Sequence, residues 1–230
     1  MLGVTNGDLL GLAGVYGYVI TIFVVAQLLK GRARNQRKIV HILTGGIVFF
    51  WWSFDTQVIM AGLAAFPFVI LLLLATPRSP IEFLRDGVLG ARSSEGHPYG
   101  LVLYAISWTA LAFFLFDDLL AASIAISAMA FGDGTGDLVG RRFGRLRYMQ
   151  NRTLEGSSAV FSATAVSILV LSWFYFDIIG YSGGSLPEIL PLFAVVIGAL
   201  VALIEAITPG AIDNLVIPLA IGGFLHILGV

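Results

Sequence analysis

The sequence predicts an all-α integral membrane protein with about eight transmembrane segments, some of them short or broken. Hydrophobic residues make up 58% of its 230 residues and charged residues only 12%, whereas a soluble globular domain carries roughly a quarter charged residues. Uncharged stretches such as residues 9–29 are long enough to cross a hydrocarbon layer of about 30 Å. Because no soluble domain or internal repeat interrupts the pattern, residues 1–230 are expected to form one polytopic domain. The lack of Cys excludes disulfides and thiolate metal sites.

The basic residues predict how these segments cross the membrane. All thirteen Lys and Arg fall within residues 30–38, 78–92 and 141–152. Two apolar runs separate each neighbouring pair of clusters, so the chain returns to the same side each time. The positive-inside rule then places all three clusters in the cytoplasm. In chain order, the apolar runs are residues 9–29, 39–54, 58–75, 99–116, 119–131, 158–176, 189–207 and 215–230.

One of these runs is shorter than the others. Residues 119–131 would span only about 20 Å as a helix, less than the hydrocarbon core. Either this helix continues into the glycines that follow, or the following loop is recessed into the membrane. We expect a multi-pass protein of the cell membrane whose chemistry lies on the cytoplasmic side. Its cytoplasmic segments would be residues 30–38, 78–98, 132–157 and 208–214.

The stretch from Phe131 to Gly144 reads FGDGTGDLVGRRFG and combines glycines, carboxylates and arginines. Alternating glycines can turn backbone N–H groups towards an anion, as phosphate-binding loops do. Asp133 and Asp137 are four residues apart, so a helical turn would place both carboxylates on one face. Mg²⁺ usually takes one or two carboxylates together with water and phosphate oxygens. Alternatively, the glycines pack helices and the arginines only set topology, but paired carboxylates at a membrane boundary favour a functional site.

No P-loop or protein-kinase signature is present. Instead the chain resembles the polyprenol kinase family, which includes dolichol, phytol and farnesol kinases, and its short length is more similar to the phytol kinase and prokaryotic branch. The resemblance spans about residues 37–218. It rests on Arg37-Lys38-Ile39-Val40-His41, Gly132 to Gly144, Arg152-Thr153-Leu154-Glu155-Gly156-Ser157, and Glu205 with Pro209 and Asp213-Asn214.

The resemblance implies a kinase that transfers the γ-phosphoryl group of CTP to the hydroxyl of an isoprenoid alcohol such as phytol or geranylgeraniol. Asp133 and Asp137 would hold Mg²⁺ or another divalent cation, and Glu155 or Asp213 would accept the alcohol proton. The residues expected to bind the nucleotide are Gly132, Gly134, Gly136, Arg141, Arg142, Gly144, Arg152, Thr153 and Ser157. Those expected to contact the substrate or support the site are Lys38, His41, Glu205 and Asn214.

The expected partners are the lipid bilayer, the isoprenoid alcohol and a nucleoside triphosphate, with no nucleic acid. Two other functions stay open. A cytidylyltransferase that forms a CDP-lipid would use the same nucleotide, metal and location. A small transporter could use Glu205 and the aspartates as ion sites, although transporters often show paired repeats and none is seen. The choice among CTP, ATP and UTP, the particular alcohol and the oligomeric state are not determined by the sequence.

Overall fold

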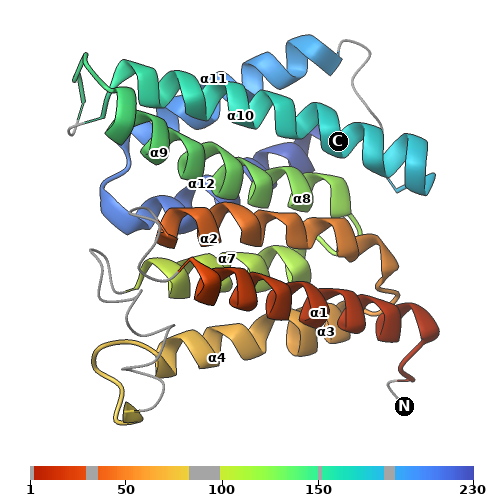
Figure 1. The fold of residues 1–230 in the computed structure, drawn as a ribbon. Coiled ribbons are helices and arrows are strands. Elements are labelled where there is room, and N and C mark those ends of the chain that lie inside the picture. The colour runs from red at the N-terminus through yellow and green to blue at the C-terminus, as the bar shows by residue number, and fades with distance from the viewer. Residues whose placement is uncertain (1–2, 30–35, 83–98, 150–151, 184–189) are drawn as a thin grey trace.

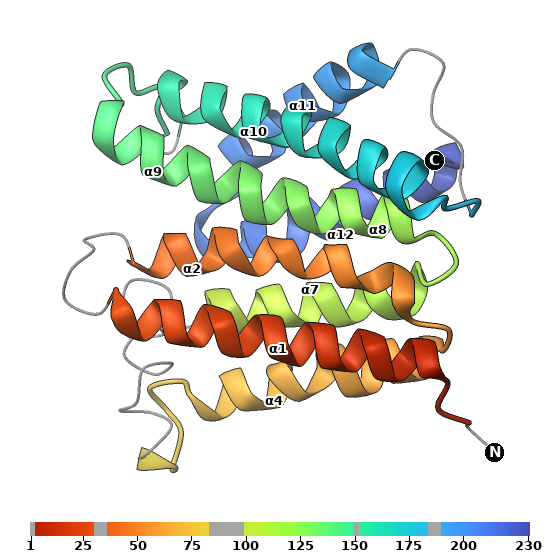
Figure 2. The same cartoon turned by 45° about the vertical axis from the view of Figure 1, so that its right-hand side comes forward.

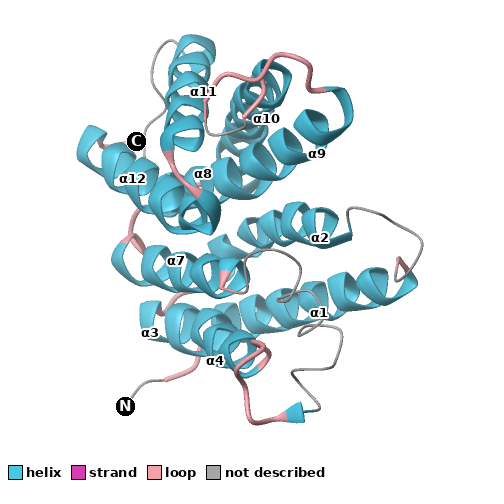
Figure 3. Cartoon of the chain, turned by 90° about the vertical axis from the view of Figure 1, so that its left-hand side faces the viewer, coloured by secondary structure: helices cyan, strands magenta, loops and turns pink. Residues whose placement is uncertain are grey.

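The computed structural model describes residues 3–29, 36–82, 99–149, 152–183 and 190–230. Within these ranges the chain forms helices and no strand, apart from an isolated bridge between Arg147 and Thr153. The helices lie side by side along a common direction, as Figures 1 and 2 show from two sides. Seen along that direction in Figure 3, they form a bundle in which no sheet takes part among the described residues. The all-α prediction is confirmed.

The helical segments follow the predicted apolar runs. In the first half of the chain they are α1 (Asn6–Leu28), α2 (Gln36–Thr44), the 3-10 segment η1 (Gly45–Ser53), α3 (Gln57–Ile59), the π segment η2 (Met60–Ala65), α4 (Phe66–Leu74) and α7 (Gly100–Phe114). In the second half they are α8 (Leu119–Ser127), the π segment η3 (Ala128–Asp133), α9 (Gly134–Phe143), α10 (Leu154–Trp173), the π segment η4 (Phe174–Ile179), α11 (Leu190–Ile207), the 3-10 segment η5 (Gly210–Ile212) and α12 (Asp213–Leu228).

Several helices are long and apolar enough to cross a membrane. Among the described residues, six meet this criterion: Asn6–Leu28, Gln57–Leu74, Leu119–Phe143, Leu154–Ile179, Leu190–Ile207 and Gly210–Leu228. Two shorter apolar helices, Lys38–Ser53 and Gly100–Phe114, correspond to the remaining predicted runs. Eight crossings therefore stay a prediction. The predicted segments 30–38 and 78–98 lie partly outside the described residues.

The helix that begins at Leu119 forms the centre of the bundle. It continues without a break through η3 and α9 to Phe143, which confirms the first of the two alternatives for the short run 119–131. All nine residues of α8 are buried. Alanine and serine fill much of this stretch, and small side chains let neighbouring helices approach closely. In Figures 1 and 2 the central helix lies between α10 on one side and α2 and α7 on the other.

A buried carboxylate fixes one end of the bundle. Asp8 completes a capping box with Thr5 at the start of α1. The same carboxylate accepts hydrogen bonds from the backbone N–H groups of Asp55 and Thr56, at 3.1 and 3.0 Å, and from the Thr56 hydroxyl at 2.8 Å. Because both carboxylate oxygens are satisfied, Asp8 serves as a structural connection between α1 and the turn that precedes α3.

The other end of the bundle gathers the polar segments. The start of α2, the end of α9, the start of α10 and the start of α12 all lie at the left of Figure 1, opposite the N-terminus. The described parts of residues 141–157 and residues 208–214 thus lie at one end of the bundle. Which side of the membrane this end faces stays a prediction.

Candidate active site

A lysine from α2 joins the two aspartates of the central helix. Lys38 Nζ lies 2.8 Å from Asp133 Oδ2 and 3.7 Å from Asp137 Oδ2. The Asp133 side chain is only 2% exposed. The π turn of η3 ends at Asp133, and π turns inside helices are frequent at functional sites. The predicted placement of both carboxylates on one helix face is therefore seen directly, because one ammonium group contacts both.

A buried histidine lies next to this triad. His41 Nε2 is 3.7 Å from Asp133 Oδ2 and 3.3 Å from the carbonyl oxygen of Met129. The imidazole packs edge-on against the ring of Tyr104, with 5.1 Å between the ring centroids. Lys38 and His41 are three residues apart on α2, so both reach the same carboxylate from one helix face.

Arg152 connects two further carboxylates from other helices. Its guanidinium lies 2.8 Å from Glu205 Oε1 on α11 and 3.2 Å from Asp213 Oδ2 at the start of α12. Burial acts to lower the pKa of Arg152, but the neighbouring carboxylates, Glu205 foremost, outweigh it and raise that pKa above its ordinary value. The guanidinium therefore stays charged.

Asn214 supports this end of α12. Its side-chain amide donates to the carbonyl oxygen of Ala211 and to Asp213 Oδ1, each at 3.1 Å, and its backbone N–H donates to Asp213 Oδ1 at 2.8 Å. The carbonyl oxygen of Asn214 accepts a hydrogen bond of 2.8 Å from Ser107 on α7. Asn214 thus orients Asp213 rather than contacting Arg152 itself.

The connection between α9 and α10 folds back on itself. Tyr148 N–H donates to the carbonyl oxygen of Arg152 at 3.0 Å, and Leu154 N–H donates to that of Leu146 at 2.9 Å. Thr153 caps α10 by accepting from Gly156 N–H at 3.2 Å. These contacts hold Arg152 at the start of α10, and its guanidinium group points towards Glu205 and Asp213.

The proposed base Glu155 has a different place. Its Oε2 atom accepts hydrogen bonds from the backbone N–H groups of Arg145 and Leu146, at 3.1 and 3.4 Å. Ser157 makes a similar contact, with 2.6 Å between its hydroxyl oxygen and that of Tyr148. Both residues therefore attach the α9–α10 connection to α10. The carboxylate of Glu155 points towards that connection, whereas the carboxylate of Asp213 belongs to the buried cluster.

The glycines form a packing surface rather than a loop, which corrects one prediction. Gly132, Gly136 and Gly140 are spaced four residues apart on the continuous helix and face α10. A methyl group added at Gly132 would lie 2.6 Å from Thr164 Oγ1, and one at Gly136 would collide with Val160. Their physical role is close helix approach, so the segment is not a glycine loop whose N–H groups cradle phosphate.

Gly134 packs in another direction. A methyl group there would collide with Ile42 and lie 3.4 Å from the ring of His41. Gly132 and Gly134 therefore contribute close packing behind the site, and open space lies in front of it.

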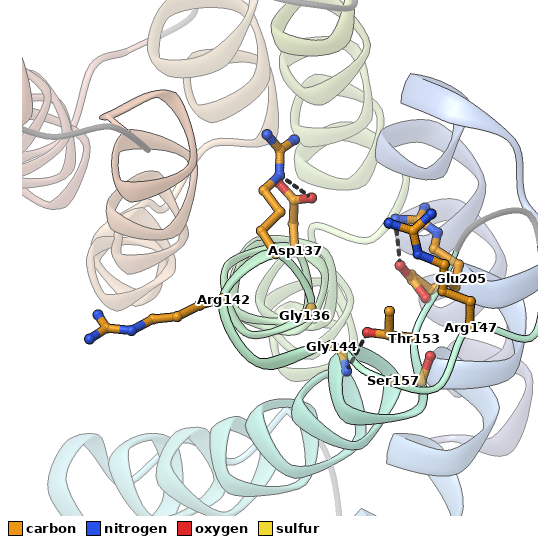
Figure 4. Close-up of a pocket in the computed structure, with 12 residues that line it drawn as sticks. Gly136, Asp137, Arg142, Gly144, Arg147, Thr153, Ser157 and Glu205 are labelled. Carbon is orange, nitrogen blue, oxygen red and sulfur yellow. Dashed lines mark hydrogen bonds and ion pairs between the residues drawn. The ribbon is translucent and has the colours of Figure 1, made fainter.

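That open space is a cavity of about 750 Å³ between α9, α10 and α11. Its lining residues are Gly136, Asp137, Gly140, Arg141, Arg142, Gly144, Arg147, Arg152, Thr153, Gly156, Ser157 and Glu205. Figure 4 shows Arg147 beside Glu205, with Thr153 and Ser157 nearby, while Arg142 points to the opposite side of α9. The Arg142 guanidinium lies 5.3 Å from the ring centroid of Phe143.

The structure brings together most of the predicted nucleotide residues around this cavity. Arg147, Gly140 and Gly156 also line it and were not assigned to the site from the sequence. Arg147 belongs to the same basic cluster as Arg152, so charge clustering is the signal that could have indicated it. Glycine spacing is the corresponding signal for Gly140.

The charge balance of the buried cluster leaves room for a cation. Four carboxylates, those of Asp133, Asp137, Glu205 and Asp213, face the two largely buried cations Lys38 and Arg152. If all are ionised, two negative charges remain within the cluster, and only one of them, that of Asp137, is paired from outside, by the exposed Arg141 at 2.9 Å. Buried charge is costly unless it is paired. Among the described residues no group of three or more His, Cys, Asp or Glu is arranged to hold a metal.

Two carboxylate oxygen atoms without a hydrogen-bond partner are suitable ligands for a magnesium ion nevertheless. Asp133 Oδ1 and Asp137 Oδ2 are buried and have no hydrogen-bond partner. Mg²⁺ commonly binds one or two carboxylates and completes its coordination with water and phosphate oxygens. The residues present therefore fit a two-carboxylate site, and the Lys38 ammonium group, 3.7 Å from Asp137 Oδ2, competes for one of these two oxygens.

The fold and this site define a polytopic α-helical membrane protein with a buried cluster of charged side chains at one end of its bundle. Similar proteins are the phytol kinase of Synechocystis sp., 32% identical over 91% of this chain and 86% of that protein, and a probable chloroplastic phytol kinase of Triticum aestivum, 31% identical over 94% and 74%. The chloroplastic farnesol kinase of Arabidopsis thaliana is 31% identical over 82% of this chain and 64% of that protein. Neither a family model nor a solved structure matches the chain. The chain belongs to the polyprenol kinase family.

Proposed function

We propose that this protein is a CTP-dependent kinase that phosphorylates the hydroxyl of an isoprenoid alcohol such as phytol or geranylgeraniol. The observation that carries the proposal is the arginine-lined cavity that ends at a buried carboxylate cluster. A triphosphate needs cationic groups along its length, and phosphoryl transfer needs neutralised charge at the reacting end. The names of the similar proteins, phytol kinase and farnesol kinase, support the choice of acceptor.

In the proposed reaction, a bond forms between the alcohol oxygen and the γ-phosphorus. The bond from that phosphorus to its bridging oxygen breaks, and the nucleoside diphosphate leaves. The hydroxyl proton passes to a carboxylate. Such transfer depends mainly on positioning and electrostatic stabilisation by the protein.

The arginines would hold the phosphates. Arg147 and Arg152 lie on the same side of the cavity as Glu205, and Arg141 pairs with Asp137 at 2.9 Å on an exposed helix face. Guanidinium groups bind phosphate through paired N–H donors. Arg142 points away from this group, so we assign it a weaker contribution than the other three.

Asp133 and Asp137 would hold Mg²⁺, which when bound neutralises charge on the phosphate oxygens. Lys38, now between these carboxylates, would turn its ammonium group towards the transferred phosphoryl group. For the proton acceptor we favour Asp213 over Glu155. Asp213 is buried in the cluster and close enough to Lys38 and Asp133 for electrostatic interaction, whereas Glu155 is engaged with backbone N–H groups.

The test uses the purified protein in detergent with labelled CTP, ATP, UTP or GTP and a panel of prenols. We expect a labelled prenyl monophosphate and stoichiometric CDP, with CTP the best donor. Release of pyrophosphate together with a CDP-lipid would instead establish a cytidylyltransferase. Absence of any nucleotide turnover with every prenol would contradict the proposal.

A further inference from the structure

A second cavity lies among other helices than the arginine-lined one, and the two share no lining residue. It measures about 420 Å³ and is enclosed by α1, α2, α4 and α7. Its walls are apolar and aromatic and include Ile20, Phe23, Phe68, Tyr104 and Trp108. Phe68 and Trp108 stack with 5.4 Å between their ring centroids. The volume lies within the range of about 300–1,000 Å³ that is typical of small-molecule sites.

One end of this cavity lies next to residues that lead to the charged cluster. Val40 and Thr44 line it from α2, the helix that also carries Lys38 and His41. Tyr104 lines it from α7 and packs against the His41 imidazole, which in turn lies 3.7 Å from Asp133 Oδ2. Tyr104 and His41 therefore lie between the apolar cavity and Asp133.

The rim of the cavity faces outwards. Ile20 and Phe23 line it, yet they are 63% and 43% exposed, on a helix that is apolar enough to cross a membrane. A lipid chain could thus enter sideways from the bilayer. The lining extends along α1 from Tyr16 to Ala26, a distance of about 15 Å at the helical rise per residue, which is close to the length of an extended farnesyl chain.

We propose that this cavity binds the isoprenoid chain of the acceptor, with its hydroxyl group at the Tyr104 end, the end nearest to His41 and Asp133. The inference rests on the proposed function and adds to it a tail site and an entry route from the membrane. The alcohol and the nucleotide then approach the carboxylates from two separate cavities. This arrangement directs the hydroxyl group of the alcohol towards the carboxylates and keeps its apolar tail out of water.

The first test is photo-cross-linking of the wild-type protein in detergent with a farnesol analogue that carries a diazirine at its terminal isoprene unit. We expect the label on peptides of α1, α4 or α7, and competition by unlabelled geranylgeraniol. Label spread over the outer surfaces of α10 and α11, or competition by a phospholipid but by no prenol, would overturn the assignment. This measurement does not depend on turnover.

The second test narrows the cavity. Ala105 lines it from α7, and Ala105→Leu should raise KM for geranylgeraniol by at least about tenfold, since each methylene excluded from an apolar site costs about fourfold in affinity. KM for dimethylallyl alcohol should rise less, because that short chain places fewer methylene groups in the cavity. Ala13→Leu is the matched control, on an exposed position of α1 that does not line the cavity.

A rim variant keeps the proposal testable if Ala105→Leu fails to fold. Ile20→Trp should slow the phosphorylation of long prenols, whereas Val24→Trp, at a half-exposed position of α1 outside the cavity, should not. If each variant and its control change the kinetics equally for prenols of every chain length, the cavity assignment is wrong. Phosphorylation of prenols by the wild-type protein would still support the proposed function. If the wild-type protein phosphorylates no prenol, the proposed function fails, and the cross-linking pattern still decides whether the cavity binds isoprenoid chains.

Discussion

Replacing Arg152 by methionine keeps an aliphatic side chain of similar length but removes the guanidinium shared by Glu205 and Asp213. The side chain of Arg152 is 22% exposed, that of Glu205 is 3% exposed and that of Asp213 is 7% exposed. Removing one partner of a buried ion pair costs about 3–5 kcal/mol, and the partial exposure of Arg152 favours the lower end. For a chain of this size, about 3 kcal/mol corresponds to a fall in Tm of about 6–12 °C.

The assay is thermal unfolding in detergent followed by tryptophan fluorescence. Arg141→Met is the matched control, because Arg141 is 65% exposed and its pair with Asp137 should contribute no more than about 0.5 kcal/mol. The double variant Arg152→Met/Glu205→Gln should recover part of the lost stability, since it removes one of the carboxylates left unpaired. If Arg152→Met melts together with the wild-type protein, or if Glu205→Gln deepens the defect, the buried-pair reasoning is wrong.

Three further expectations concern chemistry and topology. Asp133→Asn and Asp137→Asn should each abolish Mg²⁺-dependent turnover, because volume is kept and a ligand charge is lost, and Asp133→Asn should also lower Tm, because the ammonium group of Lys38 then loses its buried carboxylate partner at 2.8 Å. Near-normal turnover at saturating Mg²⁺ would exclude that residue as an essential ligand. Glu155→Gln keeps an oxygen that can accept from the backbone, so turnover should fall less than tenfold; a loss of about 10² or more, the contribution typical of a general base, would return the base role to Glu155. In this chain without native Cys, Met149→Cys and Ser182→Cys, both at exposed positions, should react with impermeant maleimide from opposite sides of the membrane, and reaction from one side would refute the topology.

Hydropathy and charge pattern were enough to predict the helical segments of this chain. The bilayer requires each crossing segment to satisfy its own backbone hydrogen bonds, so long apolar runs have little choice but to form helices. The spacing of Asp133 and Asp137 was informative for a related reason. Any helix through these residues places them on one face, whatever surrounds it.

The roles of the glycines could not be read from the same pattern. A glycine suits a phosphate-binding loop and a close helix contact equally well, because both need the absence of a side chain. Gly136 was resolved only by the position of Val160 on α10. Similarly, Glu155 and Asp213 were equivalent candidates as carboxylates near one membrane boundary, and only the folded connection between α9 and α10 turned Glu155 towards backbone N–H groups.

The sequence by itself thus determined that the chain is a helical membrane protein and which polar segments carry its family resemblance. The tertiary structure decided which charges meet. Lys38 and Asp133 are 95 residues apart in the chain, and Arg152 meets Asp213 from 61 residues away. Such pairings depend on how the helices rotate and pack against one another, and small residues along the central helix set that packing without leaving a hydrophobic or charge signal for the partners they bring together.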